Sequence, residues 1–224
     1  ERALEFARPL GAAGVIAPYE AALDGGELDA VALLTPHDQH GSQAARALRA
    51  GKHVLIEKPV VRTVDEAQSA AHAHAERPGL TLMVAENFNY APALQRAREM
   101  IAQGAVGEIQ SIAARGVGCT RPGGWRCELG PMGGGALIDG GIHTIHGLRM
   151  LGGAVASVFA LSPAVKWNAM EGEESIQLLA RMASGAAATV HVSWSNHGNP
   201  RQPEFLVMGT QGSLAVYLGR RFNV

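Results

Sequence analysis

Residues 50–59 read AGKHVLIEKP, and this stretch decides the fold. His53–Ile56 has the length of a short strand, and its Val-Leu-Ile run is apolar without alternation. Such a run is typical of a parallel strand that is covered on both faces. A helix is predicted before it over Gln39–Ala50, and the charged triplet Glu57-Lys58-Pro59 follows it. The stretch therefore predicts a central strand of a parallel sheet.

The same alternation of apolar runs and amphipathic segments continues on both sides of this block. It is the pattern of strands joined by helices, so we expect a doubly wound α/β domain over residues 1–89. In chain order we expect a helix over about Arg2–Leu10, a strand at Gly14–Ala17, a helix from Tyr19, a strand at Ala30–Leu34, the helix and strand above, a helix at Thr63–Glu76 and a strand at Thr81–Ala85.

After Tyr90 the pattern changes to that of a second domain over residues 90–224. Turn signals such as Ser184-Gly185 separate runs of strand character, which indicates an α+β domain with a mostly antiparallel open sheet. We expect helices at Pro92–Gln103 and Ala136–Leu151, and strands at Glu108–Val117, Val155–Leu161, Ser175–Met182, Ala186–Trp194 and Glu204–Met208.

The composition indicates small-molecule partners. The 224 residues carry a formal net charge of −1, which gives no electrostatic reason to expect binding to nucleic acid or to an anionic membrane. No run approaches the roughly 18 apolar residues that would span a bilayer. Cys119 and Cys127 form no C-x-x-C pair, so reduced thiols are expected, rather than a zinc knuckle or a disulfide framework. We expect a cytoplasmic protein.

Ligands of open parallel sheets bind beyond the carboxyl ends of the strands, so the residues after each strand are the first candidates. These segments are residues 35–40, 57–59 and 86–90. Lys58 could act there as acid, base or electrostatic anchor, because partial burial and the neighbouring Glu57 would act on its pKa in opposite directions. The alternative is an ordinary exposed ion pair at a strand end.

Asp139 and His143 are four residues apart, which places them on one face of a helix. A carboxylate that orients an imidazole is the arrangement of a general base. The alternative is a polar helix face with a capping aspartate. His146 extends the row, but three side chains on one helix without a distant fourth ligand make a loose metal site, and we predict none. The neighbouring glycines would let another segment approach the backbone closely.

A dinucleotide-binding domain usually shows G-x-G-x-x-G between its first strand and helix, with an acidic residue about twenty positions later. Neither feature occurs in this chain. From pattern alone, the α/β domain therefore has an unspecified ligand.

The block at residues 50–59 resembles the A-G-K-H-V-L-x-E-K-P signature of the Gfo/Idh/MocA family of oxidoreductases. Further matches in family order cover essentially the whole chain, among them Thr35-Pro36 with His40, Glu86-Asn87-Phe88, Trp125-Arg126, and Asp139-x-Gly141-x-His143. The resemblance implies an incomplete Rossmann-like sheet followed by the α+β domain. It also implies that the glycine-rich turn lies upstream of Glu1 and that the second sheet continues past Val224.

The resemblance assigns roles to individual residues. The catalytic residues of the family are matched by Lys58, Asp139 and His143. In the implied roles His143 takes the hydroxyl proton, Asp139 orients the imidazole of His143, and Lys58 donates a hydrogen bond to the reacting oxygen. In the family the Lys-Pro peptide is often cis. NAD or NADP would be the cofactor, Tyr90 and His143 would contact substrate, and the cofactor would be lined by Thr35, Pro36, His40, Glu57, Lys58, Pro59, Asn87, Trp125 and Arg126.

The implied function is hydride transfer between nicotinamide and a sugar, cyclitol or related polyol. Two alternatives known on this scaffold are an NAD-dependent glycoside hydrolase and a non-catalytic dinucleotide-binding sensor. The additional His146 favours the hydrolase alternative. The chain departs from the family at His146, where aspartate is common, and at Tyr90, where arginine is frequent. The family associates through its sheet, so we also expect a homo-oligomer through the C-terminal sheet.

Overall fold

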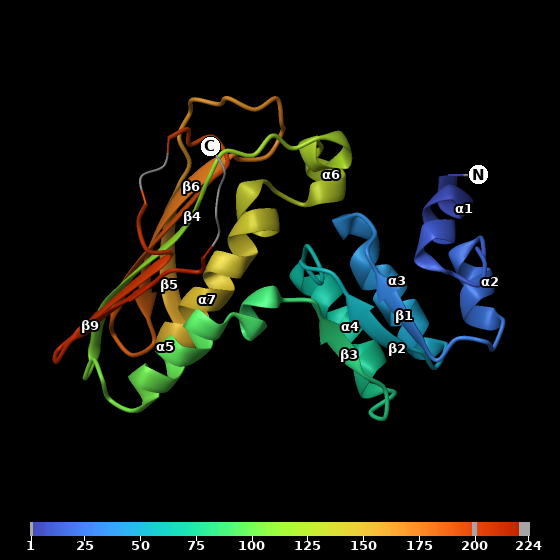
Figure 1. Cartoon of the computed structure of the whole chain (residues 1–224), viewed down its shortest axis with the longest axis horizontal. Helices are drawn as coiled ribbons and strands as arrows, with labels where there is room; N and C mark the ends of the chain where they lie inside the picture. Colours follow the sequence, from blue (N-terminus) through green and yellow to red (C-terminus); the bar gives the residue numbers. More distant parts are fainter. Residues whose placement is uncertain (1, 199–200, 220–224) are drawn as a thin grey trace. The chain divides into compact units, whose positions relative to one another are not determined.

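The computed structural model describes residues 2–198 and 201–219 and divides into two compact units. Unit 1 runs to Val84 and leaves out Pro36–Asp38, which belong to unit 2 together with the chain from Ala85 onward. Figure 1 follows both units from blue to red along the sequence. No described helix is long and apolar enough to cross a membrane.

Unit 1 is a three-stranded parallel sheet with helices between the strands, as predicted. Its strands lie in the order β1-β2-β3, with Val31 beside Val54 and Val54 beside Leu82. The elements are α1 (Arg2–Ala7), η1 (Arg8–Leu10), α2 (Tyr19–Asp24), β1 (Ala30–Leu33), α3 (His37–Arg49), β2 (His53–Ile56), α4 (Val64–Ala75) and β3 (Leu82–Val84).

The expectation that these strands are covered on both faces is wrong for the described chain. Leu33, Val54 and Ile56 are buried in one cluster with apolar residues of α2, α3 and α4. On the other face Leu55 and its register partner Met83 are exposed. The strands therefore alternate in burial, and β2 lies between two edge strands.

The strand predicted at Gly14–Ala17 is absent, since these residues have no regular structure. Val15 and Ile16 are its only large apolar residues, and both are exposed. The run is short and stops at Pro18, which has no backbone N–H for a ladder. Two apolar side chains between a glycine and a proline do not specify a strand.

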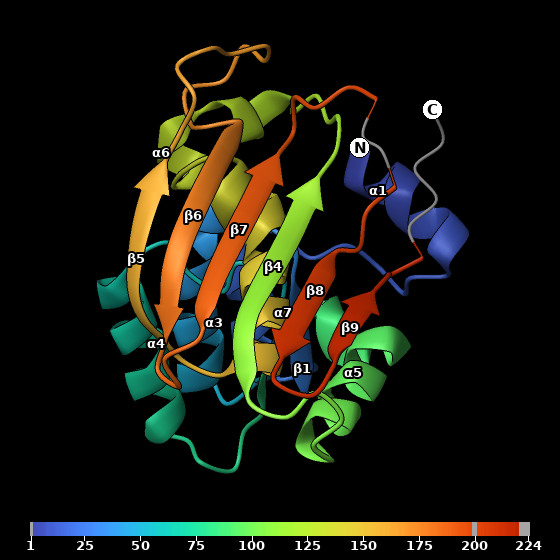
Figure 2. The ribbon, with the colours of Figure 1, turned by 90° about the vertical axis from the view of Figure 1, so that its left-hand side faces the viewer.

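Unit 2 is a six-stranded sheet with helices on one face. Figure 2 shows the strand order β5-β6-β7-β4-β8-β9. Among the described strands of this sheet, β4 and β7 alone pair in parallel, so the predicted mostly antiparallel sheet is confirmed. The elements are η2 (Asn87–Tyr90), α5 (Pro92–Ala102), β4 (Ile109–Val117), η3 (Gly124–Cys127), α6 (Leu129–Met132), η4 (Leu137–Gly141), α7 (Ile142–Gly152), β5 (Val155–Leu161), β6 (Ser175–Met182), β7 (Ala187–Ser193), β8 (Phe205–Gly209) and β9 (Ser213–Val216).

The predicted helix at Ala136–Leu151 is present, but its first part, η4, is a π-helix. It continues into α7, which lies behind the sheet in Figure 2. Glycines permit this close packing, because a Cβ on Gly141 would lie 2.9 Å from Val192 and one on Gly147 would collide with the Phe205 ring. The prediction that another segment approaches these glycines closely is confirmed. The approaching residues are Val192 of β7 and Phe205 of β8.

Candidate active site

His143, on α7, is held by a carboxylate that the sequence analysis did not single out. Its Nδ1 lies 2.8 and 2.9 Å from the two carboxylate oxygens of Glu86, the residue just before η2. The backbone N–H of Phe88 donates to the same carboxylate at 2.9 Å. The Phe88 ring stacks on the imidazole with 5.2 Å between ring centroids. His143 is therefore fixed by contacts on one edge and one face of its ring.

These contacts determine which ring nitrogen of His143 carries the proton. An ionised carboxylate only accepts hydrogen bonds, so Nδ1 must donate and the neutral ring keeps a lone pair on Nε2. Burial raises the pKa of the Glu86 carboxyl, but the hydrogen bonds from His143 and from the Phe88 N–H outweigh it and lower the pKa below its ordinary value. Glu86 therefore stays ionised, and Nε2 of His143 can accept a proton.

Asp139, which we expected to orient His143, has other partners in unit 2. Its carboxylate accepts a hydrogen bond from Nε of Arg126 at 3.1 Å, and its other oxygen lies 3.8 Å from Nε2 of His37. The expectation assumed α-helical geometry, in which residues four apart share a face. Asp139 lies in the π-helix η4, whose wider turn changes that alignment. The carboxylate on Nδ1 of His143 is that of Glu86.

Arg126, Trp125 and His37 form a cluster around Asp139. The Arg126 guanidinium lies over the Trp125 ring at 4.4 Å, and the edge of that ring system meets the His37 imidazole with 4.7 Å between centroids. Nδ1 of His37 donates to the backbone oxygen of Met132 at 3.0 Å. Arg126 is partly exposed, whereas His37 and Asp139 are buried. The cluster neutralises part of the Asp139 charge and fixes its orientation.

His146 has a partner of its own: its Nε2 lies 2.8 Å from Oδ1 of Asn89. His143 and Asp139 bond to Glu86 and Arg126, as described above. Among residues 2–198 and 201–219, no group of three or more His, Cys, Asp or Glu side chains is arranged to hold a metal ion. Asp139, His143 and His146 therefore each contact a different partner.

The loop between β5 and β6, residues 162–174, holds the segment that carries Asp139. Glu173 accepts hydrogen bonds from the backbone N–H groups of Ala136 and Leu137, at 2.6 and 3.0 Å. Lys166 donates from Nζ to the backbone oxygens of Met170, Glu171 and Gly172, at 3.1 to 3.2 Å. This loop therefore satisfies N–H groups at the start of the helix that an open end would leave unpaired.

Gly135 is where this loop and the helix touch, and any side chain there should be costly. A Cβ would collide with the backbone oxygen of Glu173, which cannot move away as a flexible side chain could. We expect Gly135→Ala to lower the free energy of unfolding by about 1–3 kcal/mol, measured by urea titration. The matched control is Gly130→Ala, where a Cβ meets nothing within 4 Å. An equal effect of the two substitutions would refute the assigned role of Gly135.

Glu86 should also make stability depend on pH in the acid range. Because its folded pKa is lowered, its contribution is fully present above the unfolded value of about 4.3 and is lost as the pH falls through the folded value. We expect the difference in unfolding free energy between wild type and Glu86→Gln to shrink as the pH is lowered from about 4.3. Urea titrations across that range measure it, and a difference that does not change would argue against the assignment.

In unit 1, the predicted residues lie at the carboxyl ends of β1 and β2. The Thr35 hydroxyl donates to Oε1 of Gln43 at 2.7 Å, and Glu57 accepts from the backbone N–H of Lys58 at 3.1 Å. The Lys58–Pro59 peptide is cis, as the resemblance implied. Thr35, Glu57 and Lys58 remain partly exposed. A hydroxyl, a carboxylate and an ammonium group at one sheet edge can form hydrogen bonds with the hydroxyl groups of a nucleotide ribose.

His40 does not fit the cofactor-lining role that we expected. Its side chain is buried, with a residue exposure of 1%. One ring nitrogen lies 2.7 Å from the Pro59 carbonyl and the other 2.8 Å from the Thr35 carbonyl. No ring nitrogen is left for a cofactor, because both are used within unit 1. The expectation failed because the His40 ring, in the first turn of α3, points toward the backbone of the loops after β1 and β2.

The remaining predicted residues differ in exposure. Tyr90 is 66% exposed and Asn87 is also exposed, whereas Pro36 and Trp125 are half-buried. The residues that the sequence analysis missed are Glu86 and His37, whose partners lie 57 and 95 positions away. The sequence signals for Glu86 were its place directly after a predicted strand and its presence in the Glu86-Asn87-Phe88 match, and neither assigned it to His143.

Two family models match this chain. Residues 1–86 match the oxidoreductase family with an NAD-binding Rossmann fold, and residues 94–215 match the GFO/IDH/MocA C-terminal domain. Together they cover nearly all of the chain and both described units.

Similar proteins of known function include sugar dehydrogenases and reductases. The chain is 27% identical to levoglucosan dehydrogenase of Pseudarthrobacter phenanthrenivorans, over 99% of this chain and 63% of that protein. It is 31% identical to 1,5-anhydro-D-fructose reductase of Ensifer adhaerens, over 96% of this chain and 64% of that protein. The chain thus spans somewhat less than two thirds of the length of these relatives.

Solved structures show the same fold. Levoglucosan dehydrogenase in complex with NADH and levoglucosan superposes with a TM-score of 0.85 at 28% identity, covering 95% of this chain and 60% of the other. GenD2 from gentamicin A biosynthesis, in complex with NAD, gives 0.85 at 32% identity, covering 99% and 63%. By sequence and by fold, the chain belongs to the GFO/IDH/MocA family of NAD-binding oxidoreductases.

Proposed function

We propose that this chain carries the catalytic groups of an NAD(P)-dependent dehydrogenase or reductase that acts on a carbinol of a sugar, cyclitol or related polyol. The observation that carries the proposal is His143, whose Nδ1 is held by Glu86 at 2.8 Å while Nε2 keeps its lone pair. This is the state of a histidine ready to take a hydroxyl proton. The sugar dehydrogenases and reductases among the relatives support the substrate class.

In this mechanism His143 accepts the substrate hydroxyl proton through Nε2. The resulting positive charge on the ring lies against the ionised Glu86, which stabilises it by a charge-assisted hydrogen bond. A bound nicotinamide supplies the hydride acceptor. The resemblance assigns to Lys58 a hydrogen bond to the reacting oxygen and gives Asp139, which is paired with Arg126, a place in the catalytic set.

The cofactor is NAD or NADP, and several of its proposed contacts stand on the resemblance and on the positions described above. They are Thr35, Glu57, Lys58 and Pro59 in unit 1, and Pro36, Asn87, Trp125 and Arg126 in unit 2. Tyr90 contacts the substrate. Its exposed ring can pack against the apolar face of a sugar.

The test is a panel of sugars, cyclitols and polyols given to the full-length protein with NAD or NADP. Hydride transfer raises the absorbance of reduced nicotinamide with at least one substrate. Cofactor binding without turnover on any substrate overturns the proposal and leaves the sensor alternative. Release of an aglycone from a glycoside without net cofactor reduction identifies the hydrolase alternative instead.

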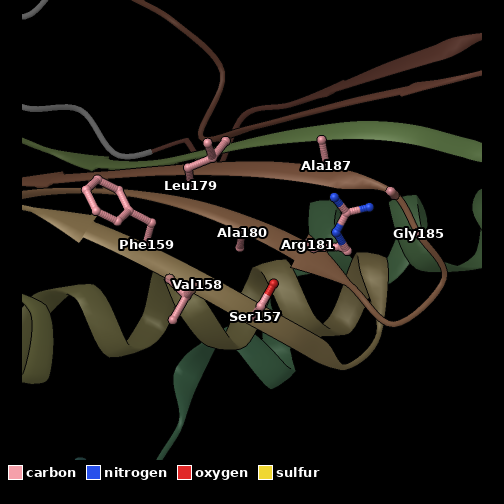
Figure 3. A pocket seen from close by; sticks show the side chains of 9 residues that line it. Ser157, Val158, Phe159, Leu179, Ala180, Arg181, Gly185 and Ala187 are labelled. Atoms are coloured by element: carbon pink, nitrogen blue, oxygen red, sulfur yellow. The ribbon is translucent and has the colours of Figure 1, made fainter.

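We also propose that the protein forms a homo-oligomer through the open face of the unit 2 sheet. On this face Phe159 and its register partner Leu179 are 67% and 58% exposed. They line a shallow hollow of about 400 Å³ together with Ser157, Arg181 and Ala187 (Figure 3). Large apolar side chains that are exposed side by side are a feature of interaction sites.

Leu179→Arg should therefore weaken self-association, because an unpaired charge would be buried in the interface. Light scattering coupled to size-exclusion chromatography should show a smaller species than wild type at equal concentration. Val165→Arg is the matched control, since Val165 is 83% exposed in the loop outside the sheet. An unchanged mass for Leu179→Arg would speak against this interface.

A further inference from the structure

The side chain of Lys166 ends among backbone carbonyl groups. Lys166 belongs to the loop between β5 and β6, which is drawn at the top of Figure 2. Its Nζ donates to the backbone oxygens of Met170, Glu171 and Gly172, at 3.2, 3.1 and 3.1 Å. An ammonium group has three N–H donors and no acceptor. The three carbonyl groups therefore provide as many acceptors as the ammonium has donors.

Three successive carbonyl groups that face one point form a site for a small cation. Each oxygen carries partial negative charge, so the three repel one another unless positive charge lies between them. Potassium channels use the same chemistry, since their backbone carbonyl oxygens replace the hydration shell of K⁺. In this loop the cation is the ammonium group of Lys166, which the chain itself supplies.

The glutamates of the loop do not take the place of these carbonyls. Glu171, Glu173 and Glu174 lie within eight positions of Lys166, and the carboxylate of each accepts hydrogen bonds from backbone N–H groups. Lys166 binds the backbone of the loop and not one of these carboxylates. Its contacts therefore fix the path of the chain over residues 170–172.

The residues that Lys166 holds are bonded to the segment that carries Arg126. The backbone N–H of Glu171 donates to the backbone oxygen of Cys127 at 2.9 Å, and its carboxylate accepts from the backbone N–H of Leu129 at 2.6 Å. Cys127 ends η3 and directly follows Arg126. Glu171 thus anchors the chain on the carboxyl-terminal side of Arg126.

The same residues meet the segment that carries Asp139. Gly172 packs against the backbone of Gly134, with which a Cβ at Gly172 would collide. Glu173 accepts from two backbone N–H groups at the start of η4, as described above, and Asp139 lies in η4. The short segment at residues 171–173 therefore contacts the chain beside both members of one ion pair.

We propose that Lys166 is a positioning residue for the Arg126–Asp139 pair, and that it acts as a tethered cation in the three-carbonyl site. The assignment rests on the proposed function, in which Arg126 lines the cofactor and Asp139 has a place in the catalytic set. Nε of Arg126 and Oδ2 of Asp139 are 3.1 Å apart. A shift of the order of 1 Å in either segment would misplace the pair and slow the reaction.

The carbonyl site is tested in the full-length protein with Lys166→Ala, which removes the ammonium group and leaves the carbonyls. The ionic strength is held at about 0.1 M with ammonium, potassium or choline chloride. Ammonium and potassium should raise the unfolding temperature of the variant above its value in choline by about 2–4 °C, because a cation that binds only the folded state stabilises it. Choline is too large for the site and has no N–H group.

Wild type should show no such difference between the salts, and neither should Arg98→Ala, which removes an exposed cation from α5. A Lys166→Ala variant that is unfolded in choline chloride but folds in ammonium chloride would support the proposal equally. The same response of Lys166→Ala and wild type to all three salts, or a variant that is unfolded in every salt, would overturn the tethered cation.

The positioning role is tested by the NMR signal of the Arg126 Nε–H group, which is identified by its loss in Arg126→Lys. In Lys166→Ala this signal should move in choline chloride and return in ammonium chloride. The kcat of the variant should fall on the order of tenfold in choline and recover in ammonium. An Arg126 signal and a kcat that both stay as in wild type would show that Lys166 does not position the pair.

These outcomes separate the inference from the proposed function. The unfolding temperature and the Arg126 signal need no substrate, so they decide the role of Lys166 even if wild type shows no turnover. A wild type without turnover would overturn the proposed function alone.

Discussion

Replacing His143 with asparagine is expected to lower kcat by about 10² to 10⁴-fold, the usual contribution of a general acid or base. The imidazole is the group in unit 2 whose free nitrogen can take the hydroxyl proton, since its other nitrogen donates to Glu86. Asparagine can keep a hydrogen bond to Glu86 but has no comparable base. Steady-state kinetics on the substrate found in the panel measure the loss.

Cofactor binding should survive this substitution, because His143 is assigned to the substrate. The control is His146→Asn. The His146 ring forms a hydrogen bond with Asn89 and has no role in the proposed chemistry. A kcat for His143→Asn within a few-fold of wild type would remove the general base from the mechanism. An equally large loss for His146→Asn would point to a different assignment of the two histidines.

The second large effect is expected for Glu86→Gln, which changes charge with almost no change in shape. A glutamine can present its NH₂ group to Nδ1 of His143, and the ring then carries its proton on Nε2. That tautomer cannot accept the substrate proton. An equivalent change behind a catalytic histidine in serine proteases costs about 10⁴-fold in kcat, and we expect a loss of about 10³ to 10⁴-fold.

Glu86→Asp distinguishes tautomer control from charge alone. Aspartate keeps the charge and the acceptor but is shorter, so it should retain more activity than glutamine. If glutamine were as active as wild type, the contact between Glu86 and Nδ1 would have no part in catalysis. The pair would then be a structural contact beneath the Phe88 ring.

The sequence was sufficient to predict the helices and strands whose local residue pattern agrees with their packing in the fold. The run at residues 53–56 is a strand beside two parallel neighbours, and the segments from Ser175 to Trp194 form antiparallel strands. The strand expected at Gly14–Ala17 is wrong because a two-residue apolar run carries too little burial to specify pairing. Strand β9 at Ser213–Val216 was not predicted as a strand.

The site was harder to predict than the fold because its contacts are long-range. His143 was a candidate from its spacing to Asp139 and from the resemblance, but the carboxylate that orients it is 57 residues away. Asp139 was assigned that role by α-helical geometry and by the resemblance, and the π-helix over Leu137–Gly141 invalidates the geometric assumption. His40 was placed in a cofactor-lining role by resemblance, whereas its burial and its two carbonyl partners direct it into the fold.

The most direct test of the central claim, that His143 is the general base, is chemical rescue of a His143→Gly variant of the full-length protein. We predict a loss in the initial rate of nicotinamide reduction of at least about 10²-fold, and partial recovery as imidazole is added. Recovery should saturate, because imidazole must bind in the space that the side chain leaves. A variant whose rate without imidazole is close to that of wild type would contradict the account.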